Sequence, residues 1–260
     1  MEIFEYKENK ITVDGMDIFY KTAGEGKPFL ILHGWGASSV SWMRVTENLA
    51  SKGFEVIVPD LPGFGKTPDP KEPWTSENYA SFILKFIRTI KLDDFYLLGH
   101  SFGGGLALLL ASGHKTKIAK LILCDAAVVR EERLNCRQKI SQILAKIGGK
   151  AASESFLYPF YAKVAYFISG NYDYYKANAL MRETFKKVID EDLTHLLGSV
   201  DQPTLVVWGE EDKATPLEDA FKISETIKSS ELKIITGTGH NPHRTAPEKL
   251  SDIIISFLNK

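Results

Sequence analysis

The amino-acid sequence predicts an α/β fold in which a mostly parallel sheet is covered by helices on both faces. Short apolar runs of four to six residues are typical of strands that are buried on both sides. Longer segments with apolar residues at helical spacing lie between these runs. Strands that alternate with helices indicate crossover connections, which place helices over both faces of a parallel sheet. At 260 residues, the chain is long enough for one large domain or for a domain with an insertion.

The predicted strands begin with a hairpin. Residues 10–13 and 16–20 flank Asp14-Gly15, which is a strong signal for a two-residue hairpin turn. The remaining predicted strands are apolar runs, at residues 28–32, 55–58, 95–98, 119–124, 204–208 and 232–235.

Helical patterns fill most of the intervals between these strands. Residues 75–90 place six apolar side chains on one face, and Thr75 or Ser76 can cap the helix. Gly53 stands where a helix over residues 42–51 would end. Further helices are predicted at residues 104–111, 216–228 and 247–258.

The alternation stops between residues 128 and 199, where several helices and no convincing strand are predicted. Nine aromatic residues within residues 151–175 argue against a linker, and we expect a helical cap. The core domain would then comprise residues 1–127 and 200–260. Because ligands of open α/β sheets bind at the carboxyl ends of the strands, a cap inserted after such an end should cover the site.

The overall composition excludes several classes of protein. A formal net charge of −1 gives no reason to expect binding to nucleic acid. No run approaches the roughly 20 apolar residues of a membrane span, and acidic residues near Met1 argue against a signal peptide. We therefore expect a cytoplasmic protein. Cys124 lies in an apolar run and Cys136 in a charged one, which favours a core thiol and a surface thiol over a disulfide.

The segment Gly99-His100-Ser101-Phe102-Gly103 fits the pattern G-x-S-x-G. It follows a predicted strand and precedes a predicted helix, so Ser101 would lie on a sharp turn at the end of the sheet. The positive end of the following helix would stabilise an oxyanion that forms beside the serine. We therefore predict that Ser101 is a nucleophile.

A nucleophilic serine needs a base, and the chain offers six histidines. His240 is the best candidate, because it follows the last predicted strand by a glycine-containing loop, and His243 is its near competitor. His100 should point away from Ser101, and His114 and His195 should be exposed. The pair His240-x-x-His243 has no third ligand at suitable spacing, so we expect no metal and no cofactor.

The base in turn needs a carboxylate to orient it. Asp212, Asp125 and Asp60 each follow a predicted strand, and each could instead cap a loop. The order Ser101, Asp212, His240 along the chain favours Asp212. In folds that present a serine in a G-x-S-x-G turn between a strand and a helix, the acid and then the histidine follow the serine in the chain.

A second donor for the oxyanion should come from another loop. His33-Gly34-Trp35-Gly36 directly follows the strand predicted at residues 28–32, and its glycines permit close approach of the backbone. We assign the backbone N–H groups of Trp35 and Phe102 as the oxyanion hole.

These motifs together resemble the α/β-hydrolase superfamily over nearly the whole chain. The matching segments are His33–Gly36, residues 60–67, residues 99–104, residues 208–212, and Gly239-His240 with Pro247-Glu248. The resemblance implies an eight-stranded, mostly parallel sheet with a helical cap, and it implies that Ser101 is the nucleophile, His240 the base and Asp212 the acid.

The resemblance also separates branches of the superfamily. Serine at position 101 argues against haloalkane dehalogenases and epoxide hydrolases, which have aspartate there. Asn241 stands where hydrolases of carbon–carbon bonds usually have tryptophan.

The function expected is that of a serine hydrolase that cleaves a carboxylic ester through an acyl-enzyme on Ser101. The aromatic cap indicates a small to medium, mainly apolar substrate, and we expect substrate contacts from Trp35, Phe102, Phe156 and Phe160. The expected partner is a small-molecule ester, and the protein would be a monomer or a homodimer.

Two alternatives stay open. The cap is basic and, around His33 and Asp60, the chain is somewhat similar to pimeloyl carrier-protein methyl ester esterases. The first alternative is therefore a methyl ester esterase or thioesterase for substrates linked to an acidic carrier protein that docks on the cap. The basic side chains are Arg130, Arg133, Arg137, Lys139, Lys146, Lys150 and Lys163. A solvated helix face is the more common role of such side chains. A ligand-binding receptor on the same fold, with weak hydrolysis, is the alternative from another class.

Overall fold

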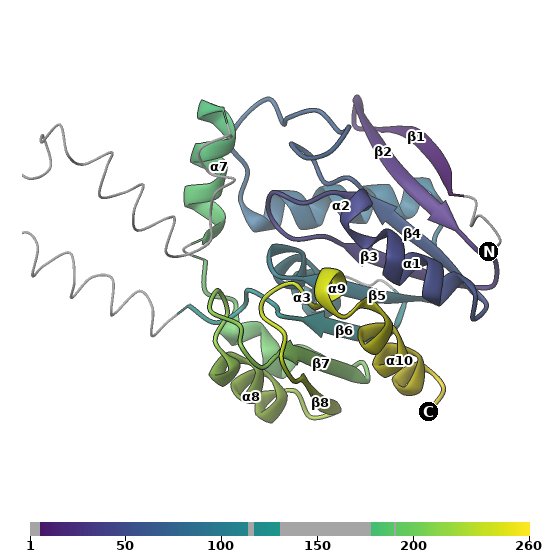
Figure 1. Cartoon of the computed structure of the whole chain (residues 1–260). Helices are drawn as coiled ribbons and strands as arrows, with labels where there is room; N and C mark the ends of the chain where they lie inside the picture. Colours follow the sequence, from purple (N-terminus) through teal and green to yellow (C-terminus); the bar gives the residue numbers. More distant parts are fainter. Residues whose placement is uncertain (1–5, 114–116, 131–177, 190) are drawn as a thin grey trace, which may run out of the picture.

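The computed structural model describes residues 6–113, 117–130, 178–189 and 191–260, and these form an eight-stranded sheet between two layers of helices (Figure 1). The strand order is β1-β2-β4-β3-β5-β6-β7-β8. All pairs from β4 to β8 are parallel, whereas β1–β2 and β2–β4 are antiparallel. The predicted mostly parallel sheet is confirmed. The strands are β1 (Lys7–Val13), β2 (Met16–Ala23), β3 (Lys27–Leu32), β4 (Phe54–Pro59), β5 (Phe95–His100), β6 (Ile118–Cys124), β7 (Thr204–Gly209) and β8 (Ser230–Ile235).

The predicted hairpin is present between β1 and β2. Val13 pairs with Met16, so the turn holds only Asp14 and Gly15, whose φ angles are 50° and 76°. Two consecutive positive φ angles match the right-handed twist of the flanking strands, and aspartate followed by glycine adopts them at low cost.

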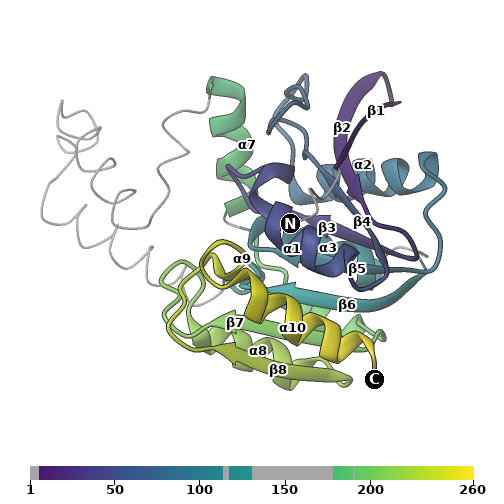
Figure 2. The same ribbon diagram turned by 45° about the vertical axis from the view of Figure 1, so that its right-hand side comes forward.

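The two faces of the sheet are covered by different helices (Figures 1 and 2), and each face carries its own apolar layer. Side chains of α2, α3 and α8 pack on one face, and those of α1 and α10 pack on the other. The described helices are α1 (Met43–Ala50), α2 (Ser76–Thr89), α3 (Phe102–Gly113), α7 (Ala179–Ile189), α8 (Leu217–Thr226), α9 (Pro242–Thr245) and α10 (Pro247–Leu258), with 3₁₀ helices η1 (Ser39–Trp42) and η3 (Thr194–Ser199).

Helix α2 begins as its sequence predicts. The Thr75 side chain accepts a hydrogen bond from the Asn78 backbone N–H, and the Asn78 side chain accepts one from the Thr75 N–H. This reciprocal cap satisfies two backbone donors that a helix terminus leaves free. Its apolar face is buried against the sheet.

Only part of the predicted cap falls within the described residues. Helix α7 and η3 lie between β6 and β7 in the chain, where the insertion was expected, and α7 buries Met181 and Phe185. His114, Cys136, Phe156, Phe160 and six of the seven basic residues of the predicted docking face lie outside the described residues. In the ranges that are described, no helix has both the length and the apolar composition that crossing a membrane requires.

Candidate active site

Ser101 occupies the sharp turn between β5 and α3 and has a φ angle of +53°. Non-glycine residues rarely adopt such an angle, and the neighbouring backbone holds it here. The Ser101 N–H donates to the Cys124 carbonyl at 3.1 Å. A Cβ atom on Gly99 would lie 2.2 Å from the Gly103 carbonyl oxygen, so the turn closes only with glycine at position 99.

The side chains of Ser101, His240 and Asp212 form one hydrogen-bonded series. His240 Nε2 lies 2.9 Å from Ser101 Oγ, and His240 Nδ1 lies 2.7 Å from Asp212 Oδ2. These residues come from the carboxyl ends of β5, β8 and β7, which meet at one edge of the sheet. The His240 side chain is 22% exposed and that of Asp212 is 0% exposed, so the imidazole separates a buried carboxylate from an accessible hydroxyl.

Asp212 is held by its own loop. Its Oδ1 accepts hydrogen bonds from the N–H groups of Ala214 and Thr215, at 2.7 and 3.0 Å, and its Oδ2 accepts one from the Thr215 hydroxyl at 2.5 Å. Burial by itself would raise the pKa of Asp212, but the hydrogen bond and charge of His240 and the bonds from Thr215 outweigh burial and lower it. The carboxylate is therefore ionised and fixed in orientation.

Thr215 is a site residue that sequence analysis missed. Its hydroxyl lies between Asp212 and His240, 3.3 Å from His240 Nδ1, and is also 3.2 Å from the Asp125 carbonyl oxygen. The spacing Asp212-x-x-Thr215 before Pro216 is the signal that could have indicated it, because an aspartate side chain commonly accepts bonds from the backbone two or three residues later.

The two other candidate acids make no hydrogen bond to His240. Asp125 is fully buried, and its Oδ1 accepts from the Gly209 N–H at 2.9 Å. Burial, reinforced by the charge of Asp212, raises the pKa of Asp125 well above its usual range, which favours the protonated acid. Asp60 instead accepts from the N–H groups of Ser39 and Lys66 and closes two loops.

Asp125, Asp212 and His240 each have a potential metal-ligating atom, and these atoms lie within 4.8 Å of one another. An ion that used all three would have to displace the 2.7 Å hydrogen bond between His240 and Asp212.

His243, the competitor for the role of base, lies away from Ser101. Its ring stacks on Trp42, with ring centroids 4.4 Å apart and 6° between the planes. Neither ring nitrogen has a hydrogen-bond partner among the described residues. Burial and the nearby charge of Arg244 lower the pKa of His243 to about 3, so the ring is neutral. His195 is exposed, as predicted.

The backbone donors assigned to the oxyanion lie at the ends of β3 and β5. Phe102 begins α3, so its N–H has no partner within the helix. Neither this N–H nor that of Trp35 donates to another described residue. The centroid of the Trp35 ring lies 5.5, 4.9 and 5.1 Å from the ring centroids of Phe102, Phe64 and Phe185, respectively, so these four rings form one aromatic group.

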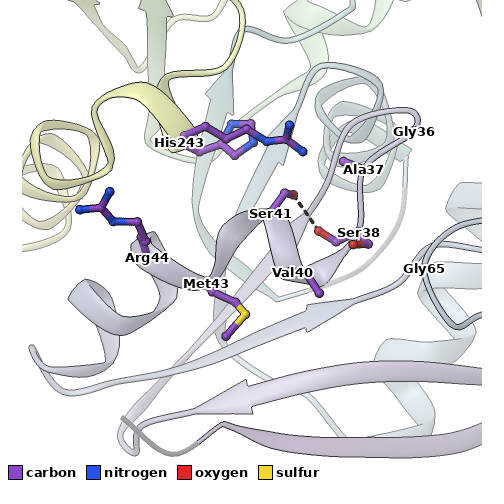
Figure 3. A pocket seen from close by; sticks show the side chains of 10 residues that line it. Gly36, Ala37, Ser38, Val40, Ser41, Met43, Arg44, Gly65 and His243 are labelled. Carbon is purple, nitrogen blue, oxygen red and sulfur yellow. Dashed lines mark hydrogen bonds between the residues drawn. The ribbon is translucent and has the colours of Figure 1, made fainter. Parts of the chain in front are cut away.

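A separate pocket has a volume of about 530 Å³ (Figure 3). Helix η1 and the start of α1 line one part of it, and α9 lines another. Its lining includes Ser38, Ser41 and His243, and the Ser41 hydroxyl donates to the Ser38 carbonyl at 2.7 Å. Ser101, Asp212 and His240 do not line it.

Comparison with known proteins identifies similar chains over almost the full length. A family model described as the alpha/beta hydrolase fold matches residues 27–141. A 2-hydroxy-6-oxo-6-(2'-aminophenyl)hexa-2,4-dienoic acid hydrolase from Metapseudomonas resinovorans is 28% identical, with 98% of this chain and 92% of the relative covered. A non-heme chloroperoxidase from Streptomyces lividans is also 28% identical, with coverages of 95% and 98%.

Among solved structures, an esterase from Exiguobacterium antarcticum superposes with a TM-score of 0.75 at 25% identity, and 98% of this chain and 100% of the esterase are covered. The match to the family model, the full-length relatives and the arrangement of the eight strands agree with one another. The chain has the α/β-hydrolase fold, and its sequence is similar to hydrolases of that superfamily over almost its full length.

Proposed function

We propose that this protein is a serine hydrolase of carboxylic esters, with Ser101 as nucleophile, His240 as general base and acid, and Asp212 as the orienting carboxylate. The observation that carries the proposal is the series of hydrogen bonds, at 2.9 and 2.7 Å, that starts at a serine on a strained turn. Each hydrogen bond has a role in acyl transfer, because serine is a nucleophile only when a positioned base accepts its proton.

The first half of the reaction forms an acyl-enzyme. Ser101 Oγ attacks the ester carbonyl carbon while His240 Nε2 accepts the hydroxyl proton, and the carbonyl oxygen becomes an oxyanion. The free N–H groups of Trp35 and Phe102 would donate to this oxyanion. When the tetrahedral intermediate collapses, the bond to the alcohol oxygen breaks and His240 protonates the departing alcohol. The negative charge of Asp212 stabilises the imidazolium formed between these steps.

The second half releases the acid. A water molecule attacks the acyl carbonyl carbon while His240 accepts one of its protons. When this second tetrahedral intermediate collapses, the bond to Ser101 Oγ breaks, His240 returns the proton to Oγ, and the carboxylic acid leaves. The aromatic group of Trp35, Phe64, Phe102 and Phe185 supports an apolar acyl or alcohol part, since these rings lie beside the proposed donors. The similarity to the esterase from Exiguobacterium antarcticum gives further support for this reaction class.

The test is a panel of p-nitrophenyl esters from acetate to octanoate, together with thioesters, lactones and a dienoic acid of the kind in the relative's name. Ser101→Ala should lower kcat/KM for the best ester by at least about 10⁴-fold, because it removes the nucleophile. Ser112→Ala is the matched control, since Ser112 is a partly buried serine of α3, and its activity should stay within about twofold.

A fluorophosphonate should label Ser101 alone, as identified by mass spectrometry of the modified peptide. Ester hydrolysis that survives Ser101→Ala, or a label on another residue, would refute the assignment. Turnover of the dienoic acid without turnover of any ester would assign a different reaction to the same residues. Ligand binding with negligible turnover of the whole panel would favour the receptor.

A further inference from the structure

His100 connects the nucleophile turn to the loop that carries His240. It is the last residue of β5, directly before Ser101, and its side chain is buried. Its Nε2 lies 2.7 Å from the backbone carbonyl oxygen of His240. A carbonyl oxygen only accepts hydrogen bonds, so Nε2 must carry the proton and the tautomer is fixed.

The surroundings of the His100 ring hold it in this orientation. The ring centroids of Trp42, His240 and His243 lie 5.8, 5.1 and 4.6 Å away. Gly34 lies in the loop that follows β3, and a Cβ atom at this position would lie 2.9 Å from His100 Nδ1. The backbone of this loop therefore also contacts the ring. Burial lowers the pKa of His100 well below its usual value, and the neighbouring histidines add to this effect. The ring therefore remains a neutral donor.

The His240 loop has few other anchors close to the imidazole. The Thr238 carbonyl accepts from the Glu211 N–H at 2.8 Å, and the Asn241 carbonyl accepts from N–H groups of α9. Within the described residues, the carbonyl of His240 itself is bonded by His100 alone. One end of this bond is His100, which directly precedes Ser101, and the other end is the backbone of His240 itself. A change in the length of the bond would therefore change the distance between the side chains of Ser101 and His240.

We propose that His100 is a positioning residue, whose hydrogen bond to the His240 carbonyl sets the distance between His240 Nε2 and Ser101 Oγ. The inference rests on the proposed function and adds to it a residue outside the serine, histidine and aspartate. Proton transfer requires a heavy-atom distance near 2.6–3.2 Å, and a displacement of about 1 Å in an active site costs roughly 10²-fold in rate.

Two substitutions at position 100 separate the hydrogen bond from the volume of the ring. His100→Leu fills the site without a donor, whereas His100→Gln keeps an amide N–H at a similar distance from the backbone. His100→Leu should lower kcat for the best ester by about 10²-fold with KM within about threefold, and His100→Gln should recover at least tenfold of that loss.

His243→Leu is the matched control, because it removes a second buried imidazole of the same cluster that makes no hydrogen bond to His240. It should lower the melting temperature while kcat stays within about threefold. Equal losses of kcat in the two leucine variants, or full activity in His100→Leu, would reduce His100 to a core residue and overturn the inference.

A measurement on the resting protein needs no substrate. Nitrogen-15 spectra of the imidazoles should show His100 protonated at Nε2 only, without titration from pH 5 to 8. A signal protonated at Nδ1 would refute the hydrogen bond. A wild-type protein without ester turnover would refute the proposed function, whereas an active wild type with a fully active His100→Leu variant would refute only the role of His100.

Discussion

His240 and His243 lie three residues apart between β8 and α10, yet their surroundings are opposite. His240 has a side-chain partner on each ring nitrogen and is partly exposed. His243 has no partner on either nitrogen among the described residues, is 2% exposed and stacks on Trp42. The single turn of α9, which begins at Pro242, carries the second histidine into the interior. Hydrogen-bond partners and solvent access, and not residue type alone, make an imidazole suitable as a base.

Substituting each histidine by glutamine should give the largest contrast. His240→Gln should lower kcat/KM for the best ester by about 10⁵-fold, because among the described residues His240 alone has a side chain hydrogen-bonded to Ser101 Oγ. His243→Gln should leave kcat/KM within about threefold. Steady-state kinetics at pH 8 measure both effects. A His240→Gln variant that keeps more than a tenth of the wild-type activity would assign the base elsewhere.

The two aspartates near His240 offer a second, smaller contrast. Asp212→Asn should lower kcat by about 10⁴-fold, because an amide neither stabilises the imidazolium nor keeps the tautomer of His240. Asp125→Asn should change kcat by less than about fivefold, since burial raises the pKa of Asp125 and so favours the neutral acid, which an amide resembles. Comparable losses in both variants would mean that the two carboxyl groups share the role of the acid.

The buried, neutral state of His243 should appear in the pH dependence of stability. Its pKa of about 3 in the folded protein lies below the ordinary value of 6.5, so the unfolded chain binds more protons between these values. Stability is therefore lost as the pH falls from about 6.5 towards 3, with a slope of at most about 1.4 kcal/mol per pH unit from this group. In His243→Gln, urea unfolding between pH 7 and 4 should show a smaller slope of the free energy of unfolding, and an unchanged slope would contradict the neutral state.

The sequence predicts most of the fold because strands β3 to β7 are short, mostly apolar runs, and because helices α1, α2, α8 and α10 have apolar residues at helical spacing. Helix α9 was not predicted, because one turn is too short for a periodic pattern, although proline at its first position is a helix-start signal. Strand β8 shows a limit of the pattern. Its apolar residues predict burial, but as the last strand of the sheet it leaves most side chains half-buried or exposed, including Ile234.

The site could be predicted in part. The motif around Ser101 and the loop position of His240 identify two residues, since both depend on local sequence. The choice among Asp212, Asp125 and Asp60 depends on loop geometry, because all three follow strands. Two further contacts, of His100 with the His240 carbonyl and of Thr215 with Asp212, follow from no repeating pattern in the sequence. They could be identified only in the three-dimensional structure.

All hydrogen bonds described above for Ser101, Asp212 and His240 come from residues of the two outer segments of the chain, 1–127 and 200–260. Residues 128–199 contribute none of these bonds, so exchanging that stretch would remove none of them. Chimeras that carry the corresponding stretch of a relative would keep these hydrogen bonds, and the ester panel would show whether substrate selectivity follows the exchanged stretch. In this sense, the hydrogen bonds that hold the three candidate side chains and the stretch 128–199 belong to separate segments of the chain, which can be varied one at a time.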